Sequence, residues 1–397
     1  MSIRWMFTTQ RRSIALRAFA FMLILVVTPD RFVLAEEHEH NRCLPRHFGQ
    51  FSDWSEPVNL GPVVNSHFND QHPAISRDGL SLYISSDRPG GFGDFDIYVS
   101  HRASVNDEWG PPQNLGPIIN TEFEDSVPTF SADGHRMYFE SGFPGGFGHN
   151  DIWVSFREDA TDDFAWQTPT NLGSGVNTDK SEGGPTIFED RHHGVTTLYF
   201  TRCLTEEPCG FGNPNEKWDI YASVMNEDGT FGTAVPVPEL NSGYRDTRTA
   251  IRSDGLELFL TSSRPGGFGG IDLWVSTRVS TDDPWIEPKN LGPIINSTYK
   301  EGAPALSCDA TTLYFYSDRP GGFGNNDLYV TTRHRLHHED NDEATFTTID
   351  PPGASSTTAH GINARGDIVG ASVSAGVVHG YLLSRRGRHE DGDDQGF

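Results

Sequence analysis

The fold of this chain is decided by the stretch Ser85–Arg102, which reads Ser-Ser-Asp-Arg-Pro-Gly-Gly-Phe-Gly-Asp-Phe-Asp-Ile-Tyr-Val-Ser-His-Arg. In its middle, Pro89 presets the backbone for the first central position of a type II turn, and Gly90 accepts the positive φ of the second. β-type runs precede and follow this turn, so the stretch predicts a β-hairpin with a long, glycine-rich loop. Related copies occur at Ser141–Arg157, Ser262–Arg278 and Ser317–Arg333, and a degraded copy occurs at Thr201–Val224.

The sequence around each hairpin repeats as well. Each copy follows a run that ends in a turn, such as Pro73–Gly79, and before that a run that starts with an aromatic residue, such as Trp54–Gly61. One unit therefore contains four short strands, which we call a, b, c and d, with b and c forming the hairpin. The units are spaced by 55, 57, 64 and 55 residues when they are aligned on Asn65, Asn120, Asn177, Asn241 and Asn296. Four strands per unit at a nearly fixed period predict a β-propeller.

The phase of the repeat predicts how the propeller closes. The chain begins with an unpaired d strand at Trp54–Leu60 and ends with an a–b–c set at Arg333. Pairing of the first strand with the last unit would complete a fifth blade and would leave no exposed strand edge. We therefore expect an all-β, five-bladed β-propeller over residues 54–333, closed by its N-terminal strand.

The segments outside the propeller differ from it in composition. Residues 1–35 resemble an export signal, since arginines precede a short apolar run and Val33-Leu34-Ala35 fits the small-residue cleavage rule. Removal of this signal would leave a secreted or periplasmic chain without a membrane span. We further expect a linker at 36–53, a polar linker at 334–345, a small β unit at 346–383 and a disordered tail at 384–397.

The charge of the chain limits its partners. The formal net charge is −25, and such a surface repels nucleic acid, whose binding needs a basic patch. Cations, basic peptides and neutral sugars are compatible with it. We therefore expect a monomer with an unidentified protein, peptide or glycan ligand.

Four cysteines occur in this chain, which we expect to be exported. Cys203 and Cys209 flank the b–c loop that departs from the repeat, and a disulfide there would contribute about 2 kcal/mol on the loop-entropy model. No second cysteine or histidine pair stands at zinc-ligand spacing, so we expect no metal site and no cofactor. Cys43 and Cys308 could be free or bonded to each other.

Acidic residues recur three positions before the strand-a proline or its equivalent. Because the loops of an antiparallel blade alternate between its two ends, the d–a and b–c loops share one face, and strand a begins there, at the mouth of the channel. The repeated acids are Asp70, Asp125, Glu182, Asp246 and Glu301. They could cap loop amides and pair with arginines such as Arg88. Alternatively, they could form a carboxylate-ringed pocket that binds a cation, a basic peptide end or sugar hydroxyls.

Two departures from the repeat add candidate ligand-binding residues. His72 lies near Asp70 in the first unit and could act with it in acid–base chemistry. Arg248 occurs in the fourth unit, where Thr249 replaces the strand-a proline. The sequence contains no Gly-x-Ser-x-Gly elbow, no phosphate-binding loop and no His-Glu-x-x-His motif, so we assign no catalytic residue.

Three motifs of the first unit resemble a known repeat. Asp78-Gly79, Ser86–Gly91 and Asp96–Val99 look like the WD-like, TolB-type propeller repeat of exported bacterial proteins. The resemblance covers about residues 54–333 and implies a propeller that binds a protein or ligand, usually without catalysis. In the C-terminal segment, His379-Gly-Tyr is similar to the core of a short extracellular β-repeat, which consists of a histidine, a small residue and an aromatic residue.

The sequence thus favours a non-catalytic binding or scaffolding propeller of the bacterial cell envelope or exterior, with its ligand site at the acidic channel mouth. The alternative is an enzyme, a glycosidase or lyase that acts on polysaccharide through carboxylates from different blades. A third interpretation is a purely structural envelope or matrix protein.

Overall fold

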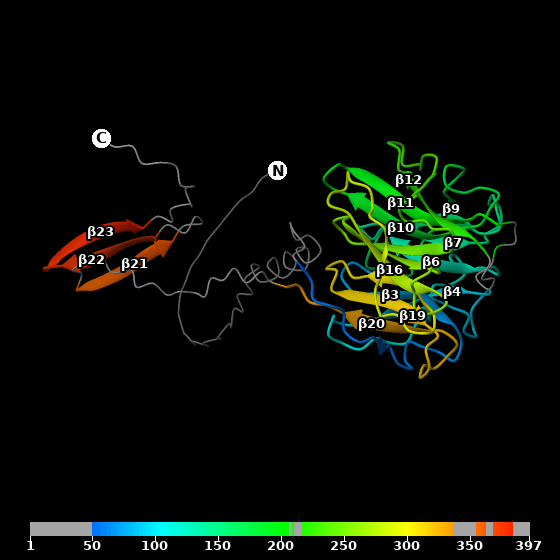
Figure 1. The fold of residues 1–397 in the computed structure, drawn as a ribbon, viewed down its shortest axis with the longest axis horizontal. Coiled ribbons are helices and arrows are strands. Elements are labelled where there is room, and N and C mark those ends of the chain that lie inside the picture. The colour runs from blue at the N-terminus through cyan, green and yellow to red at the C-terminus, as the bar shows by residue number, and fades with distance from the viewer. Residues whose placement is uncertain (1–49, 206–208, 210–215, 337–354, 363–367, 384–397) are drawn as a thin grey trace, which may run out of the picture. The chain divides into compact units, whose positions relative to one another are not determined.

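The computed structural model describes residues 50–205, 209, 216–336, 355–362 and 368–383 (Figure 1). These ranges contain strands and turns, and within them no helix is long and apolar enough to cross a membrane. The expected export signal, most of both expected linkers and the charged tail lie outside the described residues. The chain divides into two compact units between Leu336 and His337, and each unit is described by itself.

The first unit is a five-bladed β-propeller, which confirms the fold class that the repeat predicts (Figure 1). Each blade is a four-stranded sheet, and the a strands of successive blades are neighbours around a central channel. Blade 1 contains β2 (Asp70–Ile75), β3 (Ser81–Ser86), β4 (Asp96–His101) and β5 (Gln113–Asn114); blade 2 contains β6 (Asp125–Phe130), β7 (Arg136–Ser141), β8 (Asp151–Phe156) and β9 (Thr170–Asn171); blade 3 contains β10 (Glu182–Asp190), β11 (Val195–Cys203), β12 (Trp218–Val224) and β13 (Val235–Pro236); blade 4 contains β14 (Asp246–Ile251), β15 (Glu257–Ser262), β16 (Asp272–Thr277) and β17 (Lys289–Asn290); blade 5 contains β18 (Glu301–Leu306), β19 (Thr312–Ser317), β20 (Asp327–Thr332) and β1 (Val58–Asn59).

The N-terminal strand closes the ring, as the phase of the repeat predicts. β1 pairs antiparallel with β20, with Val58 opposite Val330 and Asn59 opposite Tyr329. The Asn59 side chain adds a hydrogen bond of 2.8 Å to the Asp327 carboxylate. Blade 5 therefore combines the first and the last strand of the propeller, and its outer edge is paired.

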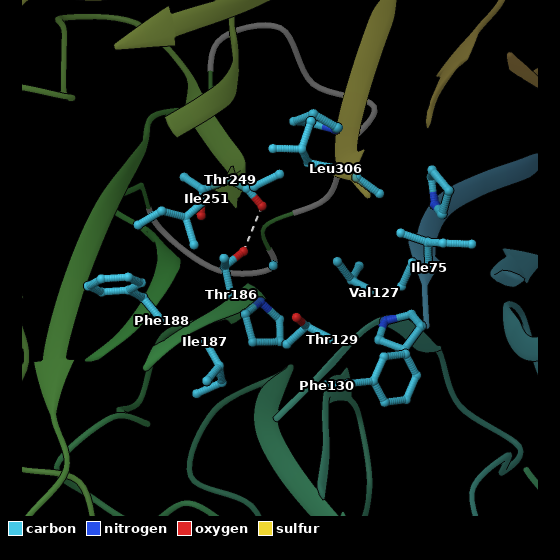
Figure 2. Close-up of a pocket in the computed structure, with 18 of the residues that line it drawn as sticks. Ile75, Val127, Thr129, Phe130, Thr186, Ile187, Phe188, Thr249, Ile251 and Leu306 are labelled. Atoms are coloured by element: carbon cyan, nitrogen blue, oxygen red, sulfur yellow. Dashed lines mark hydrogen bonds between the residues drawn. The ribbon is translucent and has the colours of Figure 1, made fainter. Parts of the chain in front are cut away.

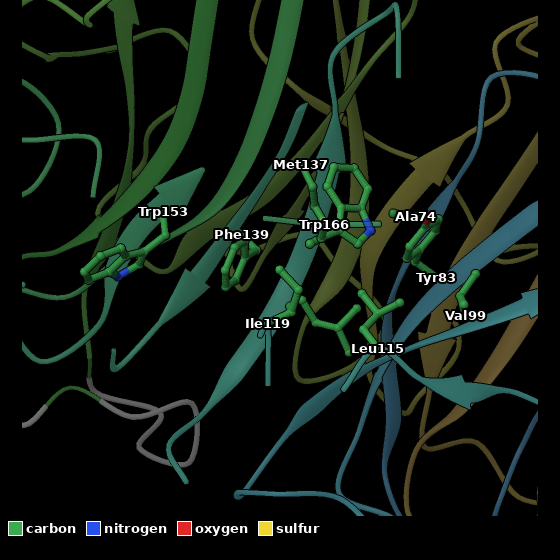
Figure 3. Close-up of a cluster of buried hydrophobic side chains, with 10 residues drawn as sticks. Ala74, Tyr83, Val99, Leu115, Ile119, Met137, Phe139, Trp153 and Trp166 are labelled. Carbon is green, nitrogen blue, oxygen red and sulfur yellow. The ribbon is translucent and has the colours of Figure 1, made fainter. Parts of the chain in front are cut away.

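Hydrophobic side chains fill the space between neighbouring blades. In β3 the three successive side chains of Leu82–Ile84 are fully buried, although successive residues of a strand point to opposite faces of its sheet. Figure 3 shows the cluster between blades 1 and 2, where Tyr83 and Val99 pack together with Met137 and Phe139. Both faces of a blade are apolar because each blade has a neighbour on either side.

The aspartate that opens strand c holds the glycine-rich b–c loop. Asp96 accepts backbone hydrogen bonds from Phe92 at 2.6 Å and Gly93 at 3.3 Å, and one from the Asn114 side chain at 2.9 Å. A Cβ atom on Gly91 would lie 2.0 Å from the Asp96 carboxylate, so this position requires glycine. The same carboxylate-to-loop bonds recur in blades 2, 4 and 5 at Asp151, Asp272 and Asp327.

Blade 3 has a different b–c loop, and a disulfide joins Cys203 to Cys209 there. Cys308 is disulfide-bonded as well, so the described residues include no free cysteine. The covalent bond in blade 3 stands where the other blades use a proline–glycine turn and a capping aspartate.

The second unit contains a three-stranded antiparallel sheet, in the order β21 (Ser356–Ile362), β22 (Ile368–Ser374) and β23 (Val377–Leu383). Ala375 and Gly376 connect β22 to β23, and both have a positive φ, which is typical of a tight type I′ hairpin turn. This sheet is the small C-terminal β unit that the sequence predicts.

We predict that the propeller depends on β1 for its stability. A variant without residues 50–60 would leave β20 with an unpaired edge and would remove Trp54, whose ring lies 4.4 Å from the Arg333 guanidinium. We expect its melting temperature to fall by about 5 °C or more, and we expect it to self-associate through the open edge. Scanning calorimetry and light scattering measure the two effects.

The matched control lacks residues 337–397 instead and should melt as the full chain does in its propeller transition. An unchanged melting temperature in the variant without residues 50–60 would contradict the role of β1.

Candidate functional site

The innermost strands of all five blades share one backbone irregularity. Each strand a contains a β-bulge, seen as a register shift against strand b, for example between Gln71 and Ala74. At each bulge one residue has a positive φ between 48° and 60°, a backbone conformation that glycine adopts more readily than other residues. We call these five residues the bulge ring: His72, Val127, Gly184, Arg248 and Ala303.

A cavity of about 220 Å³ lies in the channel on the side of the a–b loops (Figure 2). All five a strands line it, with apolar side chains such as Ile75, and the bulge ring contributes His72 and Arg248. Within its wall the Thr186 hydroxyl donates a hydrogen bond of 2.6 Å to the Thr249 carbonyl. The structure thus brings two of the residues predicted from the sequence, His72 and Arg248, to one cavity.

The five repeated acids lie elsewhere, fully buried at the start of each strand a. Each accepts the backbone N–H of the residue four positions earlier, as Asp70 does from Ser66 at 2.5 Å. Four of them also form ion pairs with arginines: Asp70–Arg88, Glu182–Arg202, Asp246–Arg264 and Glu301–Arg319. Of the two interpretations that the sequence leaves open, this geometry matches loop capping and arginine pairing. The acids do not form an open ring of carboxylates because their oxygens are occupied by these donors.

Asp125 differs from the other four acids because it has no arginine partner among the ion pairs above, and blade 2 has Phe143 where blades 1, 4 and 5 have the arginine. Its carboxyl group is hydrogen-bonded to Thr121 and Ser141, while Phe143 packs against Trp153 with ring centroids 5.2 Å apart. Burial raises the pKa of Asp125 to about 6. Blade 2 therefore carries a buried carboxyl group whose ionisation is unfavourable.

The next-to-last residue of strand b reaches the bulge of the following blade. In blades 1 and 4 this residue is a serine or threonine, whose hydroxyl satisfies the buried bulge amide. The bonds run from the Val127 N–H to Ser85 at 3.1 Å, from the Ala303 N–H to Thr261 at 2.9 Å and from the Gly184 N–H to Glu140 at 2.9 Å. A hydroxyl is enough for this role, so the carboxylate of Glu140 in blade 2 is a departure that introduces charge.

Glu140 also forms a buried ion pair with Arg248 of blade 4. The pair passes blade 3, which has two consecutive glycines at this level. A Cβ atom on Gly183 would lie 2.0 Å from the Glu140 carboxylate, and one on Gly184 would lie 3.0 Å from Cδ of Arg248. The absence of side chains in blade 3 thus makes room for a salt bridge between blades 2 and 4.

A second carboxyl group, that of Glu124, completes this cluster. The Ser126 hydroxyl lies 3.1 Å from the Glu124 carboxyl group and 3.0 Å from that of Glu140. One hydroxyl has a single hydrogen to donate, so two full, two-centre hydrogen bonds form only when one of the carboxyl groups is protonated. Burial, and then the negative charge of Glu140, raises the pKa of Glu124 to about 7. Near neutral pH Glu124 is therefore about half protonated, beside the Glu140 carboxylate that forms the ion pair with Arg248.

Burial lowers the pKa of two further groups, His72 and Arg245. Burial, and then the charge of Arg248, lowers the pKa of His72 well below its usual value, so its imidazole is neutral at neutral pH. The His72 ring packs edge-on against Tyr316, with centroids 6.0 Å apart. Burial also lowers the pKa of Arg245. In the part of the chain that the structure describes, no three metal-ligating side chains converge.

Glu124 and Glu140 were not among the residues predicted from the sequence. A signal for Glu140 was present, since the other units have Ser85, Thr201, Thr261 and Tyr316 at the same place in strand b. Arg248 is itself a visible departure from the repeat, but its pairing with Glu140 has no such signal, because the two residues are 108 positions apart in blades that are not adjacent.

Comparisons with known proteins found solved structures that resemble this chain at low sequence identity. No family model matches this chain, and no curated protein matches it in sequence. An α-L-arabinofuranosidase from Lactobacillus brevis has a TM-score of 0.47 and 14% identity over 70% of this chain and 94% of its own. The catalytic domain of a GH62 α-L-arabinofuranosidase from Coprinopsis cinerea has a TM-score of 0.43 and 13% identity over 73% of this chain and 98% of its own. A GH43_12 protein from a capybara gut metagenome has a TM-score of 0.47 and 15% identity over 72% of this chain, which spans 58% of that protein.

These comparisons correct two expectations from the sequence. The structural neighbours named above are glycosidases rather than TolB-type repeat proteins. This runs against the expected non-catalytic binding or scaffolding function, and against the expectation that the chain is more likely not an enzyme. Of the resemblance to the WD-like repeat, the five-bladed propeller is the part that is supported.

We predict that Phe143→Arg stabilises the folded protein above about pH 6. The new arginine should reach Asp125 and lie over Trp153, as the arginines of the other blades pair with their acids and lie over an aromatic ring. In the unsubstituted protein the folded-state pKa of Asp125, about 6, exceeds the unfolded value of 3.8. Its folded form therefore binds more protons, and stability falls as the pH rises between these two values. The arginine should remove this loss, raising the free energy of unfolding by up to about 2 kcal/mol at neutral pH and changing it little near pH 4.

Urea unfolding at about pH 4 and about pH 7.5 measures this difference. Phe143→Met keeps an apolar contact without a charge and is the control, which should show no pH-dependent gain. An equal effect of Phe143→Arg at both pH values would contradict the assignment of the pKa shift to Asp125.

Proposed function

We propose that this protein cleaves glycosidic bonds in a polysaccharide and that Glu124 is its general acid. The observation that carries the proposal is the Ser126 hydroxyl shared between Glu124 and Glu140. Glycoside hydrolysis needs a protonated carboxyl group that gives its proton to the leaving-group oxygen, together with a second carboxylate. A general acid works best when its pKa lies near the working pH, and the pKa of Glu124 is about 7.

Glu140 is a positioning residue in this proposal. Its carboxylate is held by Arg248, by the Ser126 hydroxyl and by the Gly184 N–H at 2.9 Å. Its negative charge raises the pKa of Glu124 and so keeps the acid protonated before proton transfer. After the transfer Glu124 is an anion, and the charge of Arg248 offsets the repulsion between the two carboxylates.

The second carboxylate of the reaction is assigned to Glu216. It comes from the b–c side of blade 3, and its charge acts on Arg245, as does the charge of Glu140. Three carboxyl groups from two blades thus interact electrostatically with Arg245 or Arg248. Hydrolysis fits this set better than elimination does, because hydrolysis uses a proton donor and a carboxylate at once.

We also propose that the protein acts outside the cytoplasm. The disulfide between Cys203 and Cys209 supports this, since disulfides persist in oxidising compartments. The repeat motifs resemble the TolB-type repeat, and we infer that the site arose on such a repeat through two departures, Glu140 and Arg248.

We predict that Glu124→Gln lowers the turnover of polysaccharide by about 100-fold or more, because an amide has no proton to give to the leaving oxygen. The loss should be much smaller with a dinitrophenyl glycoside, whose leaving group departs without a proton. Release of reducing ends from arabinan, xylan and galactan measures the first rate, and release of dinitrophenol measures the second. Glu122→Gln, an exposed residue in the same loop, is the control and should keep full turnover. Equal losses on both kinds of substrate, or no turnover of any of them by the unsubstituted protein, would refute the proposal.

Glu140→Gln should shift the pH profile of kcat/KM. Removal of the neighbouring negative charge lowers the pKa of Glu124, so the alkaline limb, where Glu124 loses its proton, should move to lower pH. Because this variant leaves Arg248 without its carboxylate, Glu140→Gln/Arg248→Met is measured beside it and should shift the limb in the same direction by less. Circular dichroism checks that both variants are folded, and a limb that moves to higher pH would overturn the role of Glu140.

A further inference from the structure

The face of the propeller that carries Glu124 also presents a set of exposed aromatic side chains. They come from the b–c loops and the d–a loops, and each is between 39% and 52% exposed. We call this set the aromatic face: Phe92, Phe147, Phe268 and Phe323 from the b–c loops, and Phe68, Phe123, Tyr244 and Tyr299 from the d–a loops.

The two kinds of aromatic residue are neighbours because the b–c loop of one blade touches the d–a loop of the next. Gly93, which follows Phe92, lies so close to the next blade that a Cβ atom on it would stand 2.1 Å from the Phe123 carbonyl oxygen. Corresponding distances of 1.7 Å and 2.0 Å occur from Gly269 to Tyr299 and from Gly324 to Phe68. Glycine at these positions is what allows the loops to meet, and each meeting point brings two aromatic residues to the surface.

These side chains have no part in the hydrophobic clusters between the blades, which are built from other residues. An exposed aromatic ring loses the free energy that its burial would supply. A repeated set of such rings on one face is typical of a surface that is covered by a ligand. The ligand has to present flat, apolar faces at several points.

The negative charge of the protein excludes some of the ligands that can stack on aromatic rings. The bases of nucleic acid stack in this way, but the net charge of −25 repels the phosphates. Anionic lipid surfaces are repelled for the same reason. Exposed carboxylates, such as those of Asp94 and Glu122, stand in the same loops as the aromatic rings. A neutral sugar ring fits both features, since its C–H face stacks on an aromatic ring and its hydroxyl groups donate to carboxylates.

We propose that the aromatic face is a substrate-binding surface and that its ligand is a neutral polysaccharide. The inference rests on the proposed glycosidase function for its role in the reaction, while binding itself does not require Glu124. Phe123 immediately precedes Glu124, and Asn150 of the blade 2 b–c loop lies 3.4 Å from the Glu124 carboxyl group. A sugar chain stacked on the rings of blades 1 and 2 therefore lies beside the proposed acid. Because stacking positions repeat around the face, longer chains bind more tightly than short ones.

Affinity electrophoresis of the full chain in native gels that contain arabinan, xylan or galactan tests this inference. Glu124→Gln is present in every sample, so that no polymer is cleaved during the run. Phe92→Ala/Phe123→Ala should weaken the retardation by at least one neutral polymer by about tenfold in Kd. The matched control is Phe156→Ala/Phe164→Ala, which removes two phenylalanines that are 39% and 45% exposed at the opposite end of blade 2. The control should leave the retardation unchanged.

Full retardation of Phe92→Ala/Phe123→Ala would overturn the inference, as would the absence of retardation by any neutral polymer. Stronger retardation by anionic polygalacturonate, or binding to phosphatidylcholine vesicles, would also overturn it. Retardation that needs the aromatic face in a protein without turnover would refute the proposed function and keep this inference. Turnover that needs Glu124, together with retardation that is unchanged by Phe92→Ala/Phe123→Ala, would keep the proposed function and refute this inference.

Discussion

The pairing of β1 with β20 is the constraint on which the rest of the structure depends. Val58 and Asn59 pair with the last strand of the propeller, and the backbone N–H groups of Ser55 and Leu60 on either side donate to that strand as well. Because the ring is closed, the five a strands stand at fixed distances around the channel, and side chains from blades that are not adjacent can meet there. The ion pair between Glu140 and Arg248 is possible only at such a fixed separation. Assembly of the charged cluster therefore depends on closure of the ring.

The repeat and its departures have different roles in this protein. The repeated acids, arginines and glycines hold the loops, as Asp96 and Gly91 do in blade 1. The departures place charge at the centre, through Glu140 in blade 2, Arg248 in blade 4 and the glycines between them in blade 3. A symmetric scaffold thus acquires an asymmetric site while its backbone stays the same. The bulge N–H that donates to Glu140 corresponds to N–H groups that donate to a hydroxyl of blade 1 or blade 4.

Much of the fold was predictable because short, repeated sequence patterns determine its hairpins and its blades. The turn chemistry of Pro89-Gly90, the spacing of the units and the unpaired strand at Trp54–Leu60 led to five blades and to the closure of the ring. The site was less accessible. Asp70 and its counterparts are equally visible in the sequence whether they face a pocket or cap a loop, and only the positions of Arg88 and the Ser66 amide distinguish the two. The contact between Glu140 and Arg248 joins blades 2 and 4, which are not adjacent, and nothing in the repeat pattern of the sequence predicts it.

The bulge ring has a consequence for how such a protein could be altered. Its positions hold a left-handed backbone whatever the side chain, and histidine, valine, glycine, arginine and alanine all occur there. Each non-glycine residue in that conformation costs about 1 kcal/mol, a cost that the surrounding strands already bear. Substitution at such a position therefore changes the side chain at a backbone cost that the ring already bears, except at Gly184, where a Cβ atom would lie 3.0 Å from Cδ of Arg248.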